Sequence, residues 1–442
     1  MSFNLLIGKC QFILFYILLI AHSSMAHDSV TNESSSKVLT PPEITTWETD
    51  LTSNYGQFIK SSANDNTKEI LVWKTSESQG YVIKNISVIQ NSVYLTYWQS
   101  NSVVCINLDS LTQKSLRVSE ELLYRSIEPF VAYDDVKDKI LLSTSKWVRI
   151  FEQSSLKLEK NLGVSLDCRI RPILLEDNLV FVEGYRGESI VRIDLNANIV
   201  WKCKLPGYVM SNPVVYGSIM IIQTRQGSYG GQATTAINLT NGKILWSETT
   251  DAYGGGVCFG DDAYLCFESD LYLDPQKTEG WIICRTPDTG KRKWRHIQRG
   301  AIEHRPVFDQ KSNNLYAVFS EFVDTTRSGG ENEVICLKAD TGSIRWKSKL
   351  ATAVKKAPAS SYEQYWSALR LQNNMLMVLD EKDVLHFFNP ENGNLILRLD
   401  LDPIKQICSV PRRKTEIINM PMIIKDKLLV FTNHGFVLCP IK

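Results

Sequence analysis

The sequence lacks an excess of charge of either sign. Its 442 residues contain 49 lysines and arginines against 48 aspartates and glutamates, so the formal net charge is +1. Nucleic acids and anionic membranes are attracted by clustered positive charge, and no global basic field is present here. We therefore expect neither as a partner. The hydrophobic content of 43% is that of an ordinary globular protein.

The sequence also lacks the short motifs that carry much enzymatic chemistry. It has no Cys-x-x-Cys pair, no two adjacent cysteines, no Gly-x-Ser-x-Gly motif and no phosphate-binding loop. Only four histidines follow residue 67, and no third metal ligand accompanies them. The glycine runs at 230–231 and 254–256 lie between expected strands and not before a helix, so they are not phosphate cradles. We expect no catalytic residue and no metal site.

Long apolar runs are absent after the first 26 residues. Within them Lys9 is the only charge, residues 10–21 form an apolar core, and Ala26 supplies a small residue at the end. This pattern predicts a signal peptide over residues 1–26, with an uncleaved anchor as the alternative. Residues 27–67 are interpreted as a flexible leader. The mature chain, without a transmembrane segment, is then expected in the secretory pathway, whether secreted, ER-lumenal or periplasmic.

What the sequence does contain is a repeat. Stretches in which a short apolar run and a polar turn lead to one large apolar residue end at Trp201, Trp246, Trp294, Trp346 and Leu397. These positions are spaced by 45 to 52 residues. A period of this length is typical of repeat folds, and of propellers in particular.

Each repeat predicts four antiparallel strands. In the repeat that ends at Trp246, three short apolar runs between residues 212 and 239 precede the pair Asn241-Gly242 and a last strand. Asn-Gly between two such runs indicates a type I′ hairpin turn, which needs positive φ at both central residues. Four strands in about 40–45 residues make one propeller blade.

The remaining repeats complete the count of blades. Degenerate copies that end near Leu116 and Glu159 keep the spacing without the Trp. The C-terminal residues 420–439 supply only three strands, and an unpaired sheet edge is a liability. We expect the N-terminal strand Glu69–Thr75 to pair with them and close the ring, with the region of Trp47 as the alternative. The predicted fold is all-β, a single eight-bladed β-propeller of four-stranded antiparallel blades over residues 68–442.

The recurrent Trp and Gly residues are interpreted as structural. Gly permits positive φ in the turn, and a Trp on the outermost strand buries about 200 Å² against the next blade, where its N–H can reach a backbone carbonyl. The residues assigned to this role are Trp73, Trp201, Trp246, Trp294, Trp346, Gly242, Gly290, Gly342 and Gly393.

The form of the repeat resembles the pyrroloquinoline-quinone-type repeat of the quinoprotein alcohol dehydrogenase-like propellers. The stretches DTGKRKW, DTGSIRW and TNGKILW match it well, whereas NANIVW keeps only the Trp and ENGNLIL only the Gly. The resemblance covers roughly residues 68–442 and implies eight blades. It specifies little chemistry, because the family includes quinone-dependent dehydrogenases as well as non-enzymatic scaffolds.

We expect a non-catalytic scaffold for protein–protein interaction, acting as a monomer through the loops of one propeller face. Insertions at 269–280 and 320–333 enlarge those loops, which carry function more often than the framework does. The aromatic run of Tyr362, Tyr365 and Trp366 is either a contact site or the first strand of a blade. The second alternative function is a glycan-binding propeller, which exposed aromatic residues suggest.

The first alternative function is a quinone- or Ca²⁺-dependent oxidoreductase. The resemblance then implies a bound pyrroloquinoline quinone, a Ca²⁺ ion and usually a disulfide between adjacent cysteines, which this sequence lacks. The acidic runs Asp261-Asp262 and 268–274 offer oxygen ligands for Ca²⁺, but GDDA between two apolar strands is also typical of a solvated hairpin tip. We expect no cofactor.

Two kinds of covalent modification are suggested by the compartment. Cys258 and Cys266 flank the expected hairpin tip almost symmetrically and are candidates for a cross-strand disulfide. Asn32, Asn85 and Asn238 each begin an Asn-x-Ser/Thr sequence and are candidate glycosylation sites.

Overall fold

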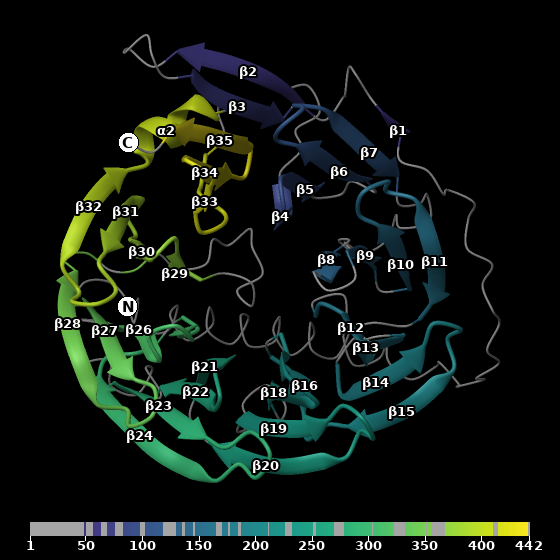
Figure 1. Ribbon diagram of the computed structural model, residues 1–442, viewed down its shortest axis with the longest axis vertical. Helices are drawn as coiled ribbons and strands as arrows, with labels where there is room; N and C mark the ends of the chain where they lie inside the picture. The colour runs from purple at the N-terminus through teal and green to yellow at the C-terminus, as the bar shows by residue number, and fades with distance from the viewer. Residues whose placement is uncertain are drawn as a thin grey trace, which may run out of the picture. The chain divides into compact units, whose positions relative to one another are not determined.

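The computed structural model describes parts of the compact unit Pro41–Lys442. The described residues are 48–49, 56–62, 69–75, 83–97, 102–117, 130–134, 138–144, 146–164, 170–175, 177–183, 187–210, 212–225, 232–250, 253–268, 278–302, 304–321, 332–350, 352, 354, 367–409 and 414–440. They form eight antiparallel sheets around a common centre (Figure 1). We number these sheets as blades 1 to 8 in chain order.

The first four blades contain the following strands. Blade 1 is β4 (Ile83–Ile89), β5 (Ser92–Tyr97), β6 (Ser102–Asn107) and β7 (Gln113–Arg117), with β1 (Glu48–Thr49) at its edge. Blade 2 is β8 (Phe130–Asp134), β9 (Lys139–Ser143), β10 (Trp147–Glu152) and β11 (Leu158–Gly163). Blade 3 is β12 (Ile173–Leu175), β13 (Asn178–Glu183), β14 (Ser189–Asp194) and β15 (Ile199–Lys204). Blade 4 is β16 (Tyr208–Val209), β17 (Val214–Tyr216), β18 (Ile219–Arg225), β19 (Gln232–Asn238) and β20 (Ile244–Thr250).

The last four blades follow the same plan. Blade 5 is β21 (Tyr253–Phe259), β22 (Ala263–Glu268), β23 (Glu279–Arg285) and β24 (Arg292–Arg299). Blade 6 is β25 (Val307–Asp309), β26 (Asn314–Ser320), β27 (Asn332–Lys338) and β28 (Ile344–Leu350). Blade 7 is β29 (Leu369–Gln372), β30 (Met375–Leu379), β31 (Val384–Phe388) and β32 (Leu395–Asp400), followed by α2 (Asp402–Ile407). Blade 8 is β33 (Met422–Ile424), β34 (Lys427–Thr432), β35 (Gly435–Pro440), β3 (Glu69–Thr75) and β2 (Gly56–Ser62).

The predicted closure of the ring is confirmed. Strand β3 pairs antiparallel with the C-terminal strand β35, with Trp73 opposite Phe436. The chain therefore forms an eight-bladed propeller whose last blade joins both ends of the sequence. The structure differs from the expected leader over residues 27–67, because β1 and β2 lie inside that range and add outer strands to blades 1 and 8.

The hydrophobic core lies in the seams between neighbouring blades. Each buried cluster draws its side chains from consecutive blades, and together the clusters run from blade 1 through blade 8 and back to blade 1. This arrangement follows from strand alternation: on a central strand of a blade, side chains point alternately toward the preceding and the following blade. Both faces are buried, so these strands are apolar almost throughout.

The turn before the outermost strand differs from the predicted type I′ turn. In blade 4 the amide of Gly242 donates to the carbonyl of Asn238, and the Asn238 side chain accepts from the amides of Thr240 and Asn241. Gly242 has φ +70°, whereas Asn241 is not among the residues with positive φ. The Asn238 side chain thus stabilises a wider turn that needs only one residue in the left-handed region.

No helix among the described residues is long and apolar enough to cross a membrane.

Candidate functional site

Four seams carry the same contact between a Trp and a glycine of the next blade, which we call the Trp–Gly latch. Trp201, Trp246, Trp294 and Trp346 donate their indole N–H to backbone carbonyls of the following blade, at 2.8–3.0 Å. The rings cover Gly242, Gly290, Gly342 and Gly393, where an added Cβ atom would collide with the indole. Each latch fastens the outer strand of one blade to the turn of the next.

Other seams have a different pair at these positions. The latch tryptophans lie opposite a third-strand residue, as Trp346 lies opposite Cys336. The same position is Lys114 in blade 1, opposite Cys105, and Lys160 in blade 2, opposite Ile150. The sequence spacing had placed these landmarks at Leu116 and Glu159 instead. Leu116 is nonetheless fully buried, so its apolar character reflects packing within the seam between blades 1 and 2.

The turn residue changes together with its partner. Leu156 stands where the glycine would be opposite Lys114, with φ +58°, and Ala197 with φ +66° corresponds to Lys160. A side chain at the turn occupies the space that an indole needs, so the large ring is absent from the outer strand. In blade 7 the position is Leu397, which is 42% exposed. It faces the joint of blade 8, where the third and fourth strands come from opposite ends of the chain.

Trp73 is anchored differently. It is fully buried, stacks on Phe436 with ring centroids 5.8 Å apart, and donates its indole N–H to Oε1 of Gln113 at 3.3 Å. The turn of blade 1 has Leu111, with φ +55°, at the glycine position. The strand register places Leu71, opposite Leu438, at the latch position of blade 8, and Trp73 lies two residues beyond it. The Trp73 ring reaches blade 1 through the Gln113 side chain.

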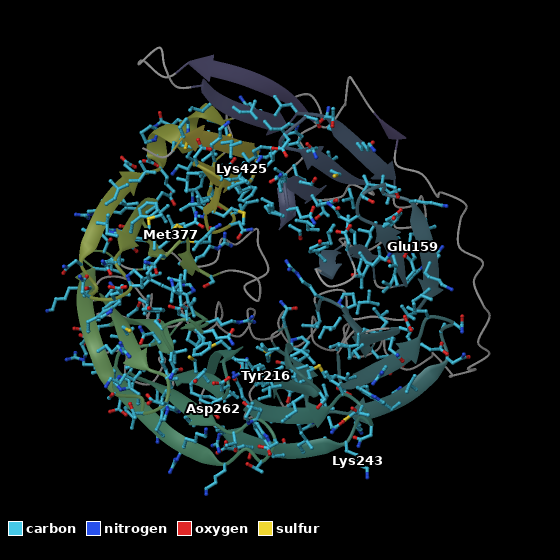
Figure 2. All side chains as sticks on the ribbon, viewed as in Figure 1. Glu159, Tyr216, Lys243, Asp262, Met377 and Lys425 are labelled. Carbon is cyan, nitrogen blue, oxygen red and sulfur yellow. The ribbon has the colours of Figure 1, made fainter. Side chains whose placement is uncertain are left out.

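A cleft of about 360 Å³ opens near the inner strands of blades 4, 5 and 6. Tyr216 on β17 is 45% exposed and stacks on Phe259 of β21, with ring centroids 5.6 Å apart. Phe308 of β25 closes the other side and stacks on Tyr264. Figure 2 places Tyr216 toward the centre of the ring and Lys243 at its rim. The cleft thus exposes an aromatic side chain that stacks on the neighbouring blade.

The same cleft contains the guanidinium-bearing side chain of Arg305. Burial raises the pKa of the nearby Cys258 thiol to about 12, although the charge of Arg305 opposes the rise. Burial also lowers the pKa of Arg305, and Cys258 partly counteracts that effect. Cys258 is therefore a protonated thiol at neutral pH and is no nucleophile.

A second cleft, of about 340 Å³, lies where blades 1 and 2 meet. Its lining is rich in side-chain amides, namely Gln90, Asn91, Asn107 and Gln153. Lys114 is the one cation among the lining residues, and Asp109 is the one anion.

The two lysines near this second cleft, Lys425 and Lys114, differ in whether they form an ion pair with a described residue. Asp109 accepts from Lys425 Nζ and from Asn91 Nδ2, both at 2.7 Å. The Lys114 ammonium forms no ion pair within the described part of the chain, and its charge opposes the burial that raises the pKa of Cys105 to about 11.

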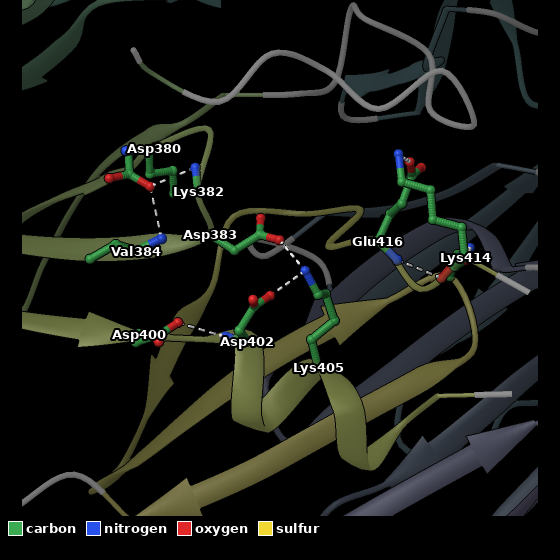
Figure 3. Close-up of polar contacts among 10 residues, drawn as sticks. Asp380, Lys382, Asp383, Val384, Asp400, Asp402, Lys405, Lys414 and Glu416 are labelled. Carbon is green, nitrogen blue, oxygen red and sulfur yellow. Dashed lines mark hydrogen bonds and ion pairs between the residues drawn. The ribbon is translucent and has the colours of Figure 1, made fainter. Parts of the chain in front are cut away.

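Blade 7 holds a buried polar network beside α2 (Figure 3). Asp380 Oδ2 accepts from His386 Nε2 at 2.9 Å and from Thr352 Oγ1 at 2.5 Å, and its Oδ1 accepts from the amides of Lys382 and Val384. Burial alone raises the pKa of Asp380, but these hydrogen bonds outweigh it and the net pKa is lowered. Because Thr352 and His386 both bind the carboxylate and not each other, the network does not have the order of a nucleophile–base relay.

The acidic residues near α2 are likewise engaged in structure. Lys405 Nζ binds Asp383 at 2.6 Å and Asp402 at 2.5 Å, and Asp400 Oδ1 accepts from the amide of Asp402 at 2.9 Å (Figure 3). At the hairpin tip of blade 5, Asp262 is buried and pairs with Lys293 at 2.8 Å. Across the described ranges no three His, Cys, Asp or Glu side chains form a group that can hold a metal ion.

The expected disulfide between Cys258 and Cys266 is not formed. The register places Cys258 opposite Tyr264 and Cys266 opposite Gly256, so the cysteines are diagonal neighbours. Diagonal side chains are about 7–8 Å apart, which is too far for the Cβ–Cβ distance of a disulfide.

The remaining predicted positions are scattered. Asn85 lies on β4, and Asn238 ends β19 with its side chain in the turn. Asn32, the aromatic run of 362–366 and most of both long insertions lie outside the described residues. Sequence reasoning missed both clefts. A signal for one of them was Lys114, which lies nine residues after Cys105, whereas Trp346 lies ten residues after Cys336 in the corresponding strands of blade 6.

Comparisons with known proteins agree with this architecture. The sequence profile of the family described as outer membrane protein assembly factor BamB matches residues 159–321 and 278–432. No curated protein matches the sequence. The crystal structure of BamB from Moraxella catarrhalis is similar, with a TM-score of 0.51 and 12% identity over 87% of this chain and 100% of that one.

Two further solved structures share the fold. The computationally designed Ika8 protein has a TM-score of 0.53 and 10% identity, over 82% of this chain and 96% of its own. A europium-containing methanol dehydrogenase has a TM-score of 0.50 and 11% identity, over 80% and 84%. At such identity the likeness shows the fold alone.

Proposed function

The chain belongs to the family described as outer membrane protein assembly factor BamB, and from that premise we propose that it is a non-catalytic scaffold that binds other proteins outside the cytoplasm. The printed name of the family is that of an assembly factor, which supports a role in holding proteins together. The signal-like residues 1–26 support a location in the secretory pathway or periplasm.

The observation that carries the proposal is the cleft at blades 4 to 6. Tyr216 is nearly half exposed, yet its ring is held by stacking on Phe259. Tyr and Arg are enriched at the centres of protein interfaces, and a preordered aromatic side chain loses little conformational entropy on binding. Tyr216 with Arg305 beside it therefore has the composition of an anchor for a partner.

The test is a quantitative affinity capture from the native compartment. Wild type, Tyr216→Ala and the control Ile199→Ala are compared; Ile199 is 64% exposed on the outer strand β15, so both variants remove an exposed apolar side chain. We expect Tyr216→Ala to weaken capture of the same partner about 10-fold or more, as for an interface anchor, and Ile199→Ala to leave it unchanged.

Two results would contradict this function. Equal capture by both variants would exclude the inner cleft as the contact site. Stoichiometric binding of pyrroloquinoline quinone in the presence of Ca²⁺, measured by absorbance of the purified protein, would replace the scaffold with the oxidoreductase alternative.

A further inference from the structure

Arg149 is a buried cation that no described residue neutralises. Its side chain on β10 is 0% exposed, and its Nε, Nη1 and Nη2 atoms have no hydrogen-bond partner among the described residues. The guanidinium lies over the ring of Trp147, 4.3 Å from the ring centroid. An aromatic face offsets only part of the cost of removing a guanidinium from water, and Arg stays protonated at neutral pH.

Strand alternation places Arg149 in the seam between blades 1 and 2. Trp147 and Phe151, two residues away on either side, belong to the cluster that contains Tyr94 and Leu116 of blade 1. Residues two apart on a strand share a face. Arg149 therefore faces blade 1, in the seam that also contains the 340 Å³ cleft.

A second cation and an unsatisfied acceptor lie in the same seam. Asn161 lies directly opposite Arg149 on β11, and its buried Oδ1 atom accepts no hydrogen bond from a described residue. Lys114 lines the cleft from blade 1 and forms no ion pair among the described residues. The carboxylate of Asp109 is already held by Lys425 and Asn91. The seam thus holds two positive charges that the described residues do not neutralise.

This seam is also fastened less firmly than those of blades 3 to 6. Lys114 and Leu156 stand where a Trp and a glycine form the latch elsewhere. No indole ties β7 to the turn of blade 2, so the outer part of the seam separates at a smaller cost than at a latched seam.

We propose that the seam between blades 1 and 2 binds an acidic peptide segment, with one carboxylate received by Lys114 in the cleft and another by Arg149 within the seam. The inference deepens the proposed scaffold function and rests on it, since it assigns a chemical class to a segment of a protein partner. Planar carboxylates match the fork of a guanidinium. Gln90 Oε1, Asn107 Nδ2 and the amide of Gln153 can pair with a peptide backbone, whereas Gln90 Nε2 and Asn107 Oδ1 are already engaged within the protein.

A phosphate group fits this cleft less well. Phosphate sites are usually built from several free backbone N–H groups in a turn. Here the amides of Asp109 and Ser110 already donate to Asn107 Oδ1, and the amide of Leu156 donates to Glu152 O. The cleft therefore offers side-chain donors and charges, which suit carboxylates.

The first experiment measures binding of a defined probe to the whole protein. The fluorescent peptide Gly-Glu-Ser-Glu-Gly is titrated by anisotropy against wild type, Lys114→Gln and Lys160→Gln. Lys160 has the equivalent place on blade 2, is exposed, and serves as the matched control. We expect Lys114→Gln to weaken binding about 10-fold and Lys160→Gln to leave it unchanged, because a charge-assisted hydrogen bond is lost only in the first.

The second experiment separates binding from folding. Arg149→Met removes the uncompensated charge, so this variant is expected to unfold at a higher temperature than wild type without ligand. Adding the acidic peptide should raise the unfolding temperature of wild type and not of Arg149→Met. The peptide Gly-Gln-Ser-Gln-Gly should raise neither.

Four outcomes would overturn the inference. They are no saturable binding of the acidic peptide, equal binding by Lys114→Gln and wild type, equal stabilisation of Arg149→Met, or full displacement by inorganic phosphate, which would indicate a general anion site. None of these outcomes involves Tyr216. A negative result for the acidic peptide would therefore leave the proposed binding of a partner protein at the cleft of blades 4 to 6 unaffected.

Discussion

The indole of Trp201 lies directly on the α-carbon of Gly242 in the next blade. A Cβ atom at Gly242 would stand 2.6 Å from Cδ2 of that indole. The indole N–H of Trp201 meanwhile donates to the carbonyl of Leu239 at 3.0 Å, three residues before the glycine. The Trp201 side chain therefore contacts the turn of the next blade in two ways: its ring packs against Gly242, and its N–H donates to the carbonyl of Leu239.

Glycine is required at this position for two separable reasons, its positive φ and the contact with the ring. We predict that Gly242→Ala lowers the free energy of unfolding by about 3 kcal/mol, because backbone strain adds to the collision with Trp201. Gly217 is a matched control, since it has φ +56° and nothing within 4 Å of its added Cβ. Gly217→Ala should cost only about 1 kcal/mol.

Chemical denaturation with urea measures both changes. If both variants lose the same unfolding free energy, the positive φ alone explains why glycine is required at position 242, and the Trp201 indole moves aside without an energetic cost.

The latches show how far the sequence can be read. The period, the turn glycines and the Trp residues together predicted eight blades and the closing strand Glu69–Thr75, because they mark where each repeat ends. The type of turn was predicted wrongly, since the Asn238 side chain stabilises a wider turn. The substitution of Lys114 for a Trp was missed, since Leu116 two residues later fits the apolar pattern better. The substitution becomes visible only when positions are counted from the turn residues. The turn of blade 2, which lies next to Lys114, has Leu156 in place of a glycine.

A latch can be installed at the seam between blades 1 and 2. Lys114→Trp alone should destabilise the protein by about 1–3 kcal/mol, because the ring meets the side chain of Leu156. Leu156→Gly alone should also destabilise it, since Leu156 is buried in the seam. The double variant should be more stable than the sum of the single changes predicts, by at least about 1 kcal/mol.

A double-mutant cycle of unfolding free energies measures this coupling. A coupling near zero would mean that strand geometry, and not the Lys114–Leu156 pair, explains why this seam has no latch. The pairing of β6 with β7 has no β-bulge, whereas the third and fourth strands of each latched blade pair with a β-bulge.

A buried Trp packs at the joint where the ring closes. Trp73 is fully buried between Phe436 of its own blade and Gln113 of blade 1. We predict that Trp73→Ala lowers the free energy of unfolding by about 3–5 kcal/mol, whereas Trp73→Phe, which keeps a ring on Phe436, loses about half as much. Thermal unfolding followed by near-ultraviolet circular dichroism checks the order. A Phe variant as unstable as the Ala variant would assign the anchoring to the Gln113 hydrogen bond.

Neither cleft was predictable from the sequence in the way the blades were. The inner cleft combines Tyr216, Phe259 and Phe308, which belong to three blades and share no local motif. The lack of a counter-charge for Arg149 among the described residues is likewise a property of the packed seam, because an Arg within an apolar strand more often extends to water or to a carboxylate. A cleft between two blades is formed by residues in which the repeats differ. The repeat pattern in the sequence shows only the residues that the repeats have in common, so it predicts the blades and not the clefts.

The buried carboxylate of Asp380 makes stability depend on acid pH. Its net pKa is lowered, because hydrogen bonds from His386, Thr352 and two backbone amides outweigh the effect of burial. A group with a lowered folded pKa contributes stability that is fully present above its unfolded pKa of about 3.9 and is lost as pH falls through the folded value. Asp380→Asn should therefore be less stable than wild type by about 2–3 kcal/mol at pH 7, and this gap should narrow below about pH 4.

Asp402→Asn is the control, because Asp402 is half exposed and its pair with Lys405 should be worth less than about 1 kcal/mol. Urea unfolding between pH 3 and 7 measures all three proteins, and parallel pH profiles of wild type and Asp380→Asn would show that the network persists without the charge.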